Sequence, residues 1–71
     1  MGDGELLPPE VRRDQILALL QRSGQLSVRG CAEQLGVSEV TIRSDFALLE
    51  RDGLLRRVWG GAVLDRPLWP E

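Results

Sequence analysis

The stretch VRGCAEQLGVSEVTIRSDFALLERDGLLRR, residues 28–57, decides the fold of this chain. It predicts a short helix, a tight turn and a second helix, which is the spacing of a helix-turn-helix. Ala32 suits a close crossing of two helices, and Gly36 suits a turn that needs a positive φ. Ser38 is a natural N-cap for the second helix, and Ile42, one turn further on, is expected to face the core. Such a motif usually lays its second helix in the DNA major groove.

The neighbouring sequence predicts a third helix ahead of this pair. The expected helices span residues 9–23, 28–35 and 39–52, and Gly24 and Gly53 follow the first and the last of them. Ser27 is expected to cap the middle helix. In the first helix, Ile16, Leu19 and Leu20 recur at helical spacing, and the solvent side is expected to carry Arg12, Arg13, Gln21 and Arg22.

A β-hairpin is expected after the third helix. Residues 54–58 read as a strand, 59–61 as a turn and 62–64 as the returning strand, and residues 25–27 can pair as a short extra strand. The predicted fold is therefore mostly α with a small β-hairpin, a winged helix-turn-helix with three helices and a wing. We expect this domain to cover residues 9–64, between a flexible N-terminal tail at 1–8 and a linker at 65–71.

Composition narrows the classes of function. The 71 residues include no His, no Tyr and one Cys, which removes an internal disulfide and most metal and general-base chemistry. We therefore expect no enzyme, no cofactor and no metal site. No membrane span and no secretion signal are visible, and the single Cys fits a reducing cytoplasm. The net charge of −2 argues against DNA binding, because such domains are usually basic.

The third predicted helix has two different faces. On a helical wheel Ile42, Phe46 and Leu49 cluster toward the core. The opposite face is small and polar, as in a helix that enters a groove, and Arg43 lies at its flank. The residues of that face are Val40, Ser44 and Ala47.

Each candidate DNA contact on this helix has a structural alternative. Ser38 and Thr41 can hold a phosphate at the helix N-terminus, or Ser38 can serve only as a cap. Arg43 can donate to a base edge or a phosphate, or form an ion pair with Glu39 or Glu50. Val40 and Ser44 are candidate base readers, with Val40 touching a thymine methyl.

The wing offers a second set of candidates. Arg56 and Arg57 alternate sides along a strand, so one is expected to face DNA, unless both are only solubilising charges. Gly60 and Gly61 can let the backbone approach a phosphate, or simply form the turn. Trp59 completes the candidate list of Ser38, Glu39, Val40, Thr41, Arg43, Ser44, Ala47, Arg56, Arg57, Trp59, Gly60 and Gly61.

Two further residues are expected to be structural. Asp45 would repel phosphate, so we expect it to pair with an arginine of the first helix or the wing. Cys31 is expected to be a small buried hydrophobe, since a nucleophile would need a histidine partner.

Residues Arg12 to Leu64 resemble the N-terminal domain of the DeoR family of bacterial transcriptional regulators. The strongest pieces are VSEVTIRSDFALLE, DGLLRR and the GGA of the wing. The resemblance implies a sequence-specific DNA-binding domain of a repressor of sugar or nucleoside genes. It also implies a C-terminal domain, absent here, that oligomerises and binds a phosphorylated sugar, so the chain is an excised domain or a short relative.

Some positions depart from the family pattern. Ser44 replaces the second arginine of TIRRDL, and Trp59 replaces a histidine before the wing glycines. Gly30 and Cys31 stand where the middle helix of the family usually carries an acid and Leu. These differences concern the DNA target more than the fold, and the alternative function is a winged-helix module that binds protein instead of DNA.

Overall fold

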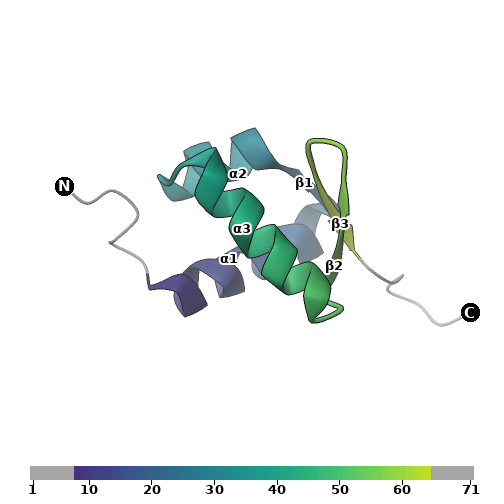
Figure 1. Cartoon of the computed structure of the whole chain (residues 1–71). Helices are drawn as coiled ribbons and strands as arrows, with labels where there is room; N and C mark the ends of the chain where they lie inside the picture. The colour runs from purple at the N-terminus through teal and green to yellow at the C-terminus, as the bar shows by residue number, and fades with distance from the viewer. Residues whose placement is uncertain (1–7, 65–71) are drawn as a thin grey trace, which may run out of the picture.

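The computed structural model describes residues 8–64, which form three helices and one three-stranded sheet (Figure 1). The tail expected at 1–8, apart from Pro8, and the linker expected at 65–71 lie outside the described residues. The elements, in chain order, are α1 Pro9–Ser23, β1 Gln25–Ser27, α2 Val28–Leu35, α3 Glu39–Arg51, β2 Leu55–Val58 and β3 Gly61–Leu64. The expected winged helix-turn-helix is confirmed, and only the boundaries of α3, β2 and β3 move by one residue.

The helix boundaries follow from local chemistry. The hydroxyl oxygen of Ser27 accepts a hydrogen bond from the Gly30 N–H at 2.9 Å, which caps α2 as expected. A Cβ at Gly30 would lie 2.8 Å from that same oxygen, so a larger residue here would require the Ser27 side chain to shift. Gly36 ends α2 with φ at +73° and donates its N–H to the carbonyl of Ala32 at 2.9 Å.

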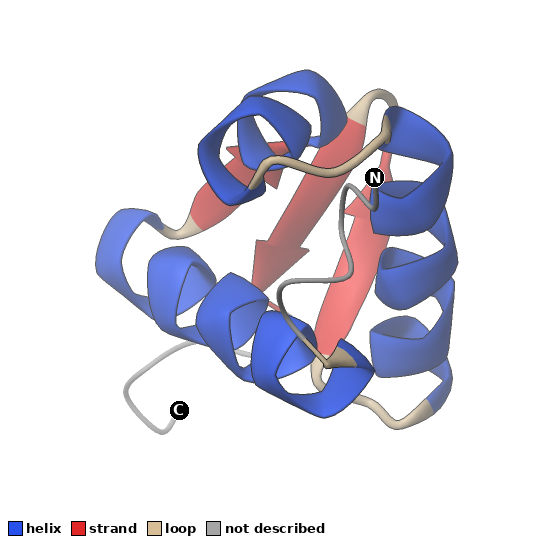
Figure 2. Cartoon of the chain, turned by 90° about the vertical axis from the view of Figure 1, so that its left-hand side faces the viewer, coloured by secondary structure: helices blue, strands red, loops and turns tan. Residues whose placement is uncertain are grey.

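The sheet has the order β1-β3-β2, and both pairings are antiparallel. The short strand Gln25–Ser27 is confirmed, and it makes β3 the central strand. The three helices lie on one side of the sheet (Figure 2). The core lies between these two layers, and its buried members are Ile16, Leu20, Val28, Cys31, Ala32, Ile42, Phe46, Leu49, Leu55 and Ala62.

Cys31 is buried, as expected, with 3% of its surface exposed. Burial raises the pKa of its thiol, and the nearby carboxylate of Asp45 raises that pKa further. The unfolded thiol ionises first as the pH rises above about 8.5, so this group stabilises the fold below that pH and less above it.

We expect iodoacetamide to alkylate Cys31 slowly in the native protein near that pH and quickly in urea, because only the exposed thiolate reacts. Mass spectrometry after timed quenching measures both rates. Equal rates with and without urea would contradict the burial of this thiol.

Candidate nucleic-acid interface

Helix α3 presents one face to the core and one to solvent. Ile42, Phe46 and Leu49 are at most 4% exposed, which fixes the rotation of the helix about its own axis. Val40, on the opposite face, is 72% exposed, and Ser44 is exposed beside it. Ala47, the third residue expected on that face, is half-buried. The solvent face of α3 is thus narrower at its C-terminal half than the wheel predicts.

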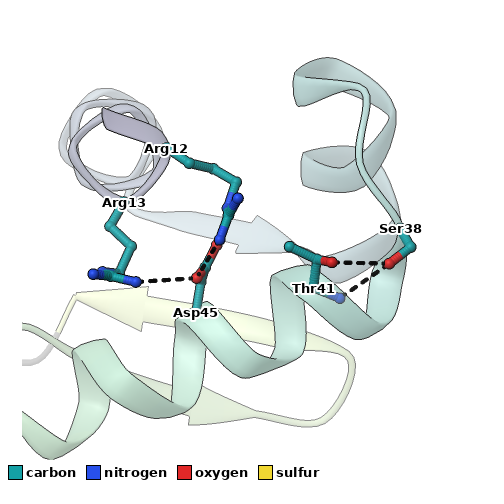
Figure 3. Close-up of polar contacts among 5 residues, drawn as sticks. All are labelled: Arg12, Arg13, Ser38, Thr41 and Asp45. Atoms are coloured by element: carbon teal, nitrogen blue, oxygen red, sulfur yellow. Dashed lines mark hydrogen bonds and ion pairs between the residues drawn. The ribbon is translucent and has the colours of Figure 1, made fainter. Parts of the chain in front are cut away.

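The N-terminus of α3 is held by a local hydroxyl network (Figure 3). The Ser38 oxygen accepts the backbone N–H of Thr41 at 3.1 Å and donates to the Thr41 hydroxyl oxygen at 3.1 Å. Ser38 is therefore confirmed as the N-cap. Its contact with a phosphate stays a prediction, and a phosphate there would share the site with these two hydrogen bonds.

Arg43 is paired along the helix in the free protein. Its Nη2 lies 3.1 Å from Oε1 of Glu39, one turn toward the N-terminus. Both side chains are about half exposed, at 56% and 44%. The ion-pair alternative is thus present, and any contact of Arg43 with DNA has to replace or extend this pair.

A buried charge cluster joins α3 to α1 (Figure 3). The Asp45 carboxylate is 2% exposed and accepts two hydrogen bonds from Arg12, one from Nε and one from Nη2 at 3.0 Å. Nη1 of Arg13 lies 3.5 Å from the same carboxylate. The pairing of Asp45 with an arginine of the first helix is therefore confirmed. Hydrogen bonding to Asp45 raises the pKa of the Arg12 guanidinium above its ordinary value, against the opposing effect of burial.

The expectation that Arg12 lies on the solvent side of α1 is wrong. Arg12 is only 9% exposed, because its guanidinium turns inward to meet Asp45. The helical wheel places charged residues outside by default, and it contains no information on a partner in another helix. The expected pairing of Asp45, on the core side of α3, with an arginine of the first helix or the wing already indicated that one arginine could face inward.

The wing separates its two arginines. Arg57 shares a face of β2 with the buried Leu55, while Arg56 points to the opposite face. The backbone N–H of Arg57 donates to Oε2 of Glu50 in α3 at 3.0 Å. Both side chains are exposed, and Arg57 is the one on the α3 side of the sheet.

The turn of the wing is short and anchored. Trp59 and Gly60 connect β2 to β3, Trp59 is fully exposed at 101%, and Gly60 has φ at +76°. The Gly60 carbonyl accepts the N–H of Val28, the first residue of α2, at 2.9 Å. The turn is thereby tied to the helix-turn-helix, so Trp59 projects from a fixed support.

Gly61 lies apart from the other wing candidates. It is buried in the central strand β3, and a Cβ at this position would lie 2.0 Å from the carbonyl oxygen of Leu26. The close approach of β1 to β3 therefore explains the glycine. Sequence reasoning could not find this role, because it depends on which strand lies beside β3. Being buried, Gly61 is not part of the exposed candidate interface.

The net charge of the described residues differs from that of the whole chain. Residues 8–64 contain eight arginines and seven acidic residues, so their formal net charge is +1. Segments 1–7 and 65–71 carry four acidic residues and one arginine, which brings the chain to −2. The acidic net charge of the chain therefore comes from segments 1–7 and 65–71, and the described domain is close to neutral.

Within residues 8–64, no group of three or more His, Cys, Asp or Glu side chains is placed to hold a metal ion. In that same part of the chain, no helix combines the length and the apolar character needed to cross a membrane.

A family model described as a DeoR-like helix-turn-helix domain matches residues 12–67. The chain belongs to the DeoR-like helix-turn-helix family. Several curated members of this DeoR-like family are similar to it. A putative aga operon transcriptional repressor of Escherichia coli O157:H7 is 38% identical over 89% of the chain and 23% of the relative.

Two further DeoR-like relatives extend the range of organisms. A lactose phosphotransferase system repressor of Lactococcus lactis is 40% identical over 75% of the chain and 21% of the relative. The HTH-type transcriptional regulator GlpR of Haloferax volcanii is 43% identical over 82% of the chain and 22% of the relative. The chain thus spans less than a quarter of the length of these three relatives, and no solved structure matches it significantly.

The DeoR-like match decides between the two functions left open by the sequence. The relatives are named as transcriptional repressors or regulators. This supports a DNA-binding regulatory domain and not the alternative of a winged helix that binds only protein.

Proposed function

We propose that this domain reads duplex DNA with the solvent face of α3 in the major groove and the wing on the backbone. The observation that carries the proposal is that face, where Val40 and Ser44 are exposed opposite a core-facing row. A small polar helix face of this kind fits between the walls of the groove, where side chains reach base edges. Arg43 stands at its flank.

The wing supplies the backbone contacts in this proposal. Arg57, on the α3 side of β2, donates to a phosphate, and Trp59 packs against the sugar–phosphate chain at the anchored turn. Gly60 lets the backbone of that turn come close to the DNA. The hydroxyls of Ser38 and Thr41 provide a further phosphate contact at the start of α3.

A fluorescence-anisotropy titration of the chain with duplex DNA of random sequence, at low and at moderate salt, tests the proposal. Binding that weakens steeply with salt is the expected result, because phosphate neutralisation releases counterions. Absence of binding at low salt would overturn it. A tandem dimer of the chain checks that weak binding by one copy is not mistaken for none.

Replacing Arg57 by Gln is expected to make the slope of log affinity against log salt less steep by about 1, since one phosphate contact is lost. Arg56→Gln, the matched change on the opposite face of β2, is expected to decrease the steepness less. The two slopes are measured by the same titration. A larger decrease for Arg56→Gln would reverse this assignment of the wing.

We further propose that the whole protein represses a sugar or nucleoside operon as an oligomer and releases DNA when it binds a phosphorylated sugar. The names of the relatives, which include a lactose phosphotransferase system repressor and a putative galactitol utilization operon repressor, support the class of operon. Oligomerisation would place two domains on two half-sites and raise the affinity through effective concentration.

A further inference from the structure

The first two turns of α3 carry one half-exposed acid and one exposed base. Glu39 begins the helix and Arg43 follows one turn later, and their charged atoms lie 3.1 Å apart. The acid precedes the base, which is the favourable order for an i,i+4 pair, and it also lies at the positive end of the helix dipole. The other charge in these turns, Asp45, is buried against α1. The exposed part of this segment is therefore electrically neutral.

This neutrality is unexpected on a surface that meets DNA. Attraction between basic side chains and phosphates provides nearly all the affinity for random sequences. A neutral reading helix gains little from that attraction, and an exposed carboxylate near the backbone is repelled by it. The arginines of the wing still provide attraction, but they do so on another element.

We propose that Glu39 is a specificity-determining residue, which rests on the DNA-reading function proposed above. Glu39 holds Arg43 in one orientation and cancels its charge, so α3 binds weakly to DNA in which Arg43 meets only phosphates. On a matched site, Arg43 donates to a guanine edge and Glu39 accepts from the N4 amino group of a cytosine. Breaking the ion pair costs free energy, and the two base contacts compensate for this cost only when the right bases are present. The ion pair therefore lowers the affinity for other sequences.

The test compares the chain with its Glu39→Gln variant on two duplexes, one of random sequence and one selected by the wild-type chain from a random pool. We expect Glu39→Gln to bind the random duplex about three- to tenfold more tightly, with a salt slope steeper by about 1, because Arg43 is released to a phosphate. The affinity of Glu39→Gln for the selected duplex is expected to increase less than this, or to decrease, relative to the wild-type chain. The ratio of the two affinities, which measures discrimination, should fall about tenfold.

The chain contains a matched control for this change in charge. Glu33 in α2 also pairs with an arginine one turn away, since Arg29 Nε lies 3.8 Å from its Oε2, and both side chains are more than 70% exposed. Glu33→Gln alters the net charge by the same amount on a different helix. It is expected to leave the discrimination ratio unchanged, and urea unfolding of both variants verifies that the fold is retained.

Two results would overturn the role of Glu39. One is an unchanged discrimination ratio in Glu39→Gln, and the other is an equal fall in Glu33→Gln, which would show an effect of net charge alone. Both results require that the wild-type chain binds DNA. If the wild-type chain binds neither duplex, even as a tandem dimer, the proposed function itself fails, and the two failures are thus distinguishable.

Discussion

Asp45→Ala is expected to lower the free energy of unfolding by about 3–5 kcal/mol, because it leaves the guanidinium of Arg12 buried without its partner. The carboxylate is 2% exposed and accepts both hydrogen bonds of Arg12. A domain of this size has a total stability of only about 4–10 kcal/mol, so the variant should be largely unfolded at moderate urea concentrations. Urea unfolding followed by far-UV circular dichroism measures the loss.

A double-mutant cycle separates the charge pair from general packing. The double variant Arg12→Met/Asp45→Ala should lose less free energy of unfolding than the sum of the losses in the two single variants. The reason is that neither charge of the pair is then left buried without the other. Glu33→Ala, which removes an acid that is 74% exposed, should change the stability by less than about 0.5 kcal/mol. Strict additivity of Arg12→Met and Asp45→Ala would show that the pair does not join α1 to α3.

Gly61→Ala is expected to lower the free energy of unfolding by about 3 kcal/mol or more, although it adds only one methyl group. The new Cβ would lie 2.0 Å from the Leu26 carbonyl oxygen, so β1 and β3 would have to separate. Because β1 runs directly into α2, this change should also disturb the support of the wing turn. Thermal unfolding monitored by circular dichroism is the measurement.

The neighbouring glycine provides the comparison. Gly60 has φ at +76° and no atom within 4 Å of an added Cβ, so Gly60→Ala should cost only about 1–2 kcal/mol of backbone strain. The order of the two losses is the decisive result. A smaller loss for Gly61→Ala than for Gly60→Ala would contradict the close approach of Leu26 to β3.

Much of the fold is predictable because its signals are local. A serine hydroxyl that accepts a backbone N–H, as at Ser27 and Ser38, involves residues only three positions apart. The left-handed turn at Gly36 likewise depends on the glycine itself. The amphipathic period of α3 fixes which side chains face the core, and the core-facing row of Ile42, Phe46 and Leu49 is confirmed.

The candidate interface is less predictable, because it depends on which elements become neighbours. The choice between Arg56 and Arg57 needs the face of β2 that lies toward α3. The pairing of Arg43 with Glu39 rather than with Glu50 follows from helical spacing, because Glu39 lies four positions away and Glu50 lies seven. The choice between the two arginines of the wing does not follow from spacing.

The sequence by itself determined the helix-turn-helix, the wing and the family, because each rests on residues close together along the chain. Only the tertiary structure decided that Arg12 is buried against Asp45, 33 positions away, and that Gly61 faces the backbone of β1. The physical reason is that burial and close approach belong to pairs of elements. A periodic pattern shows which face of one element is turned inward, but the contacts on that face depend on the element packed against it.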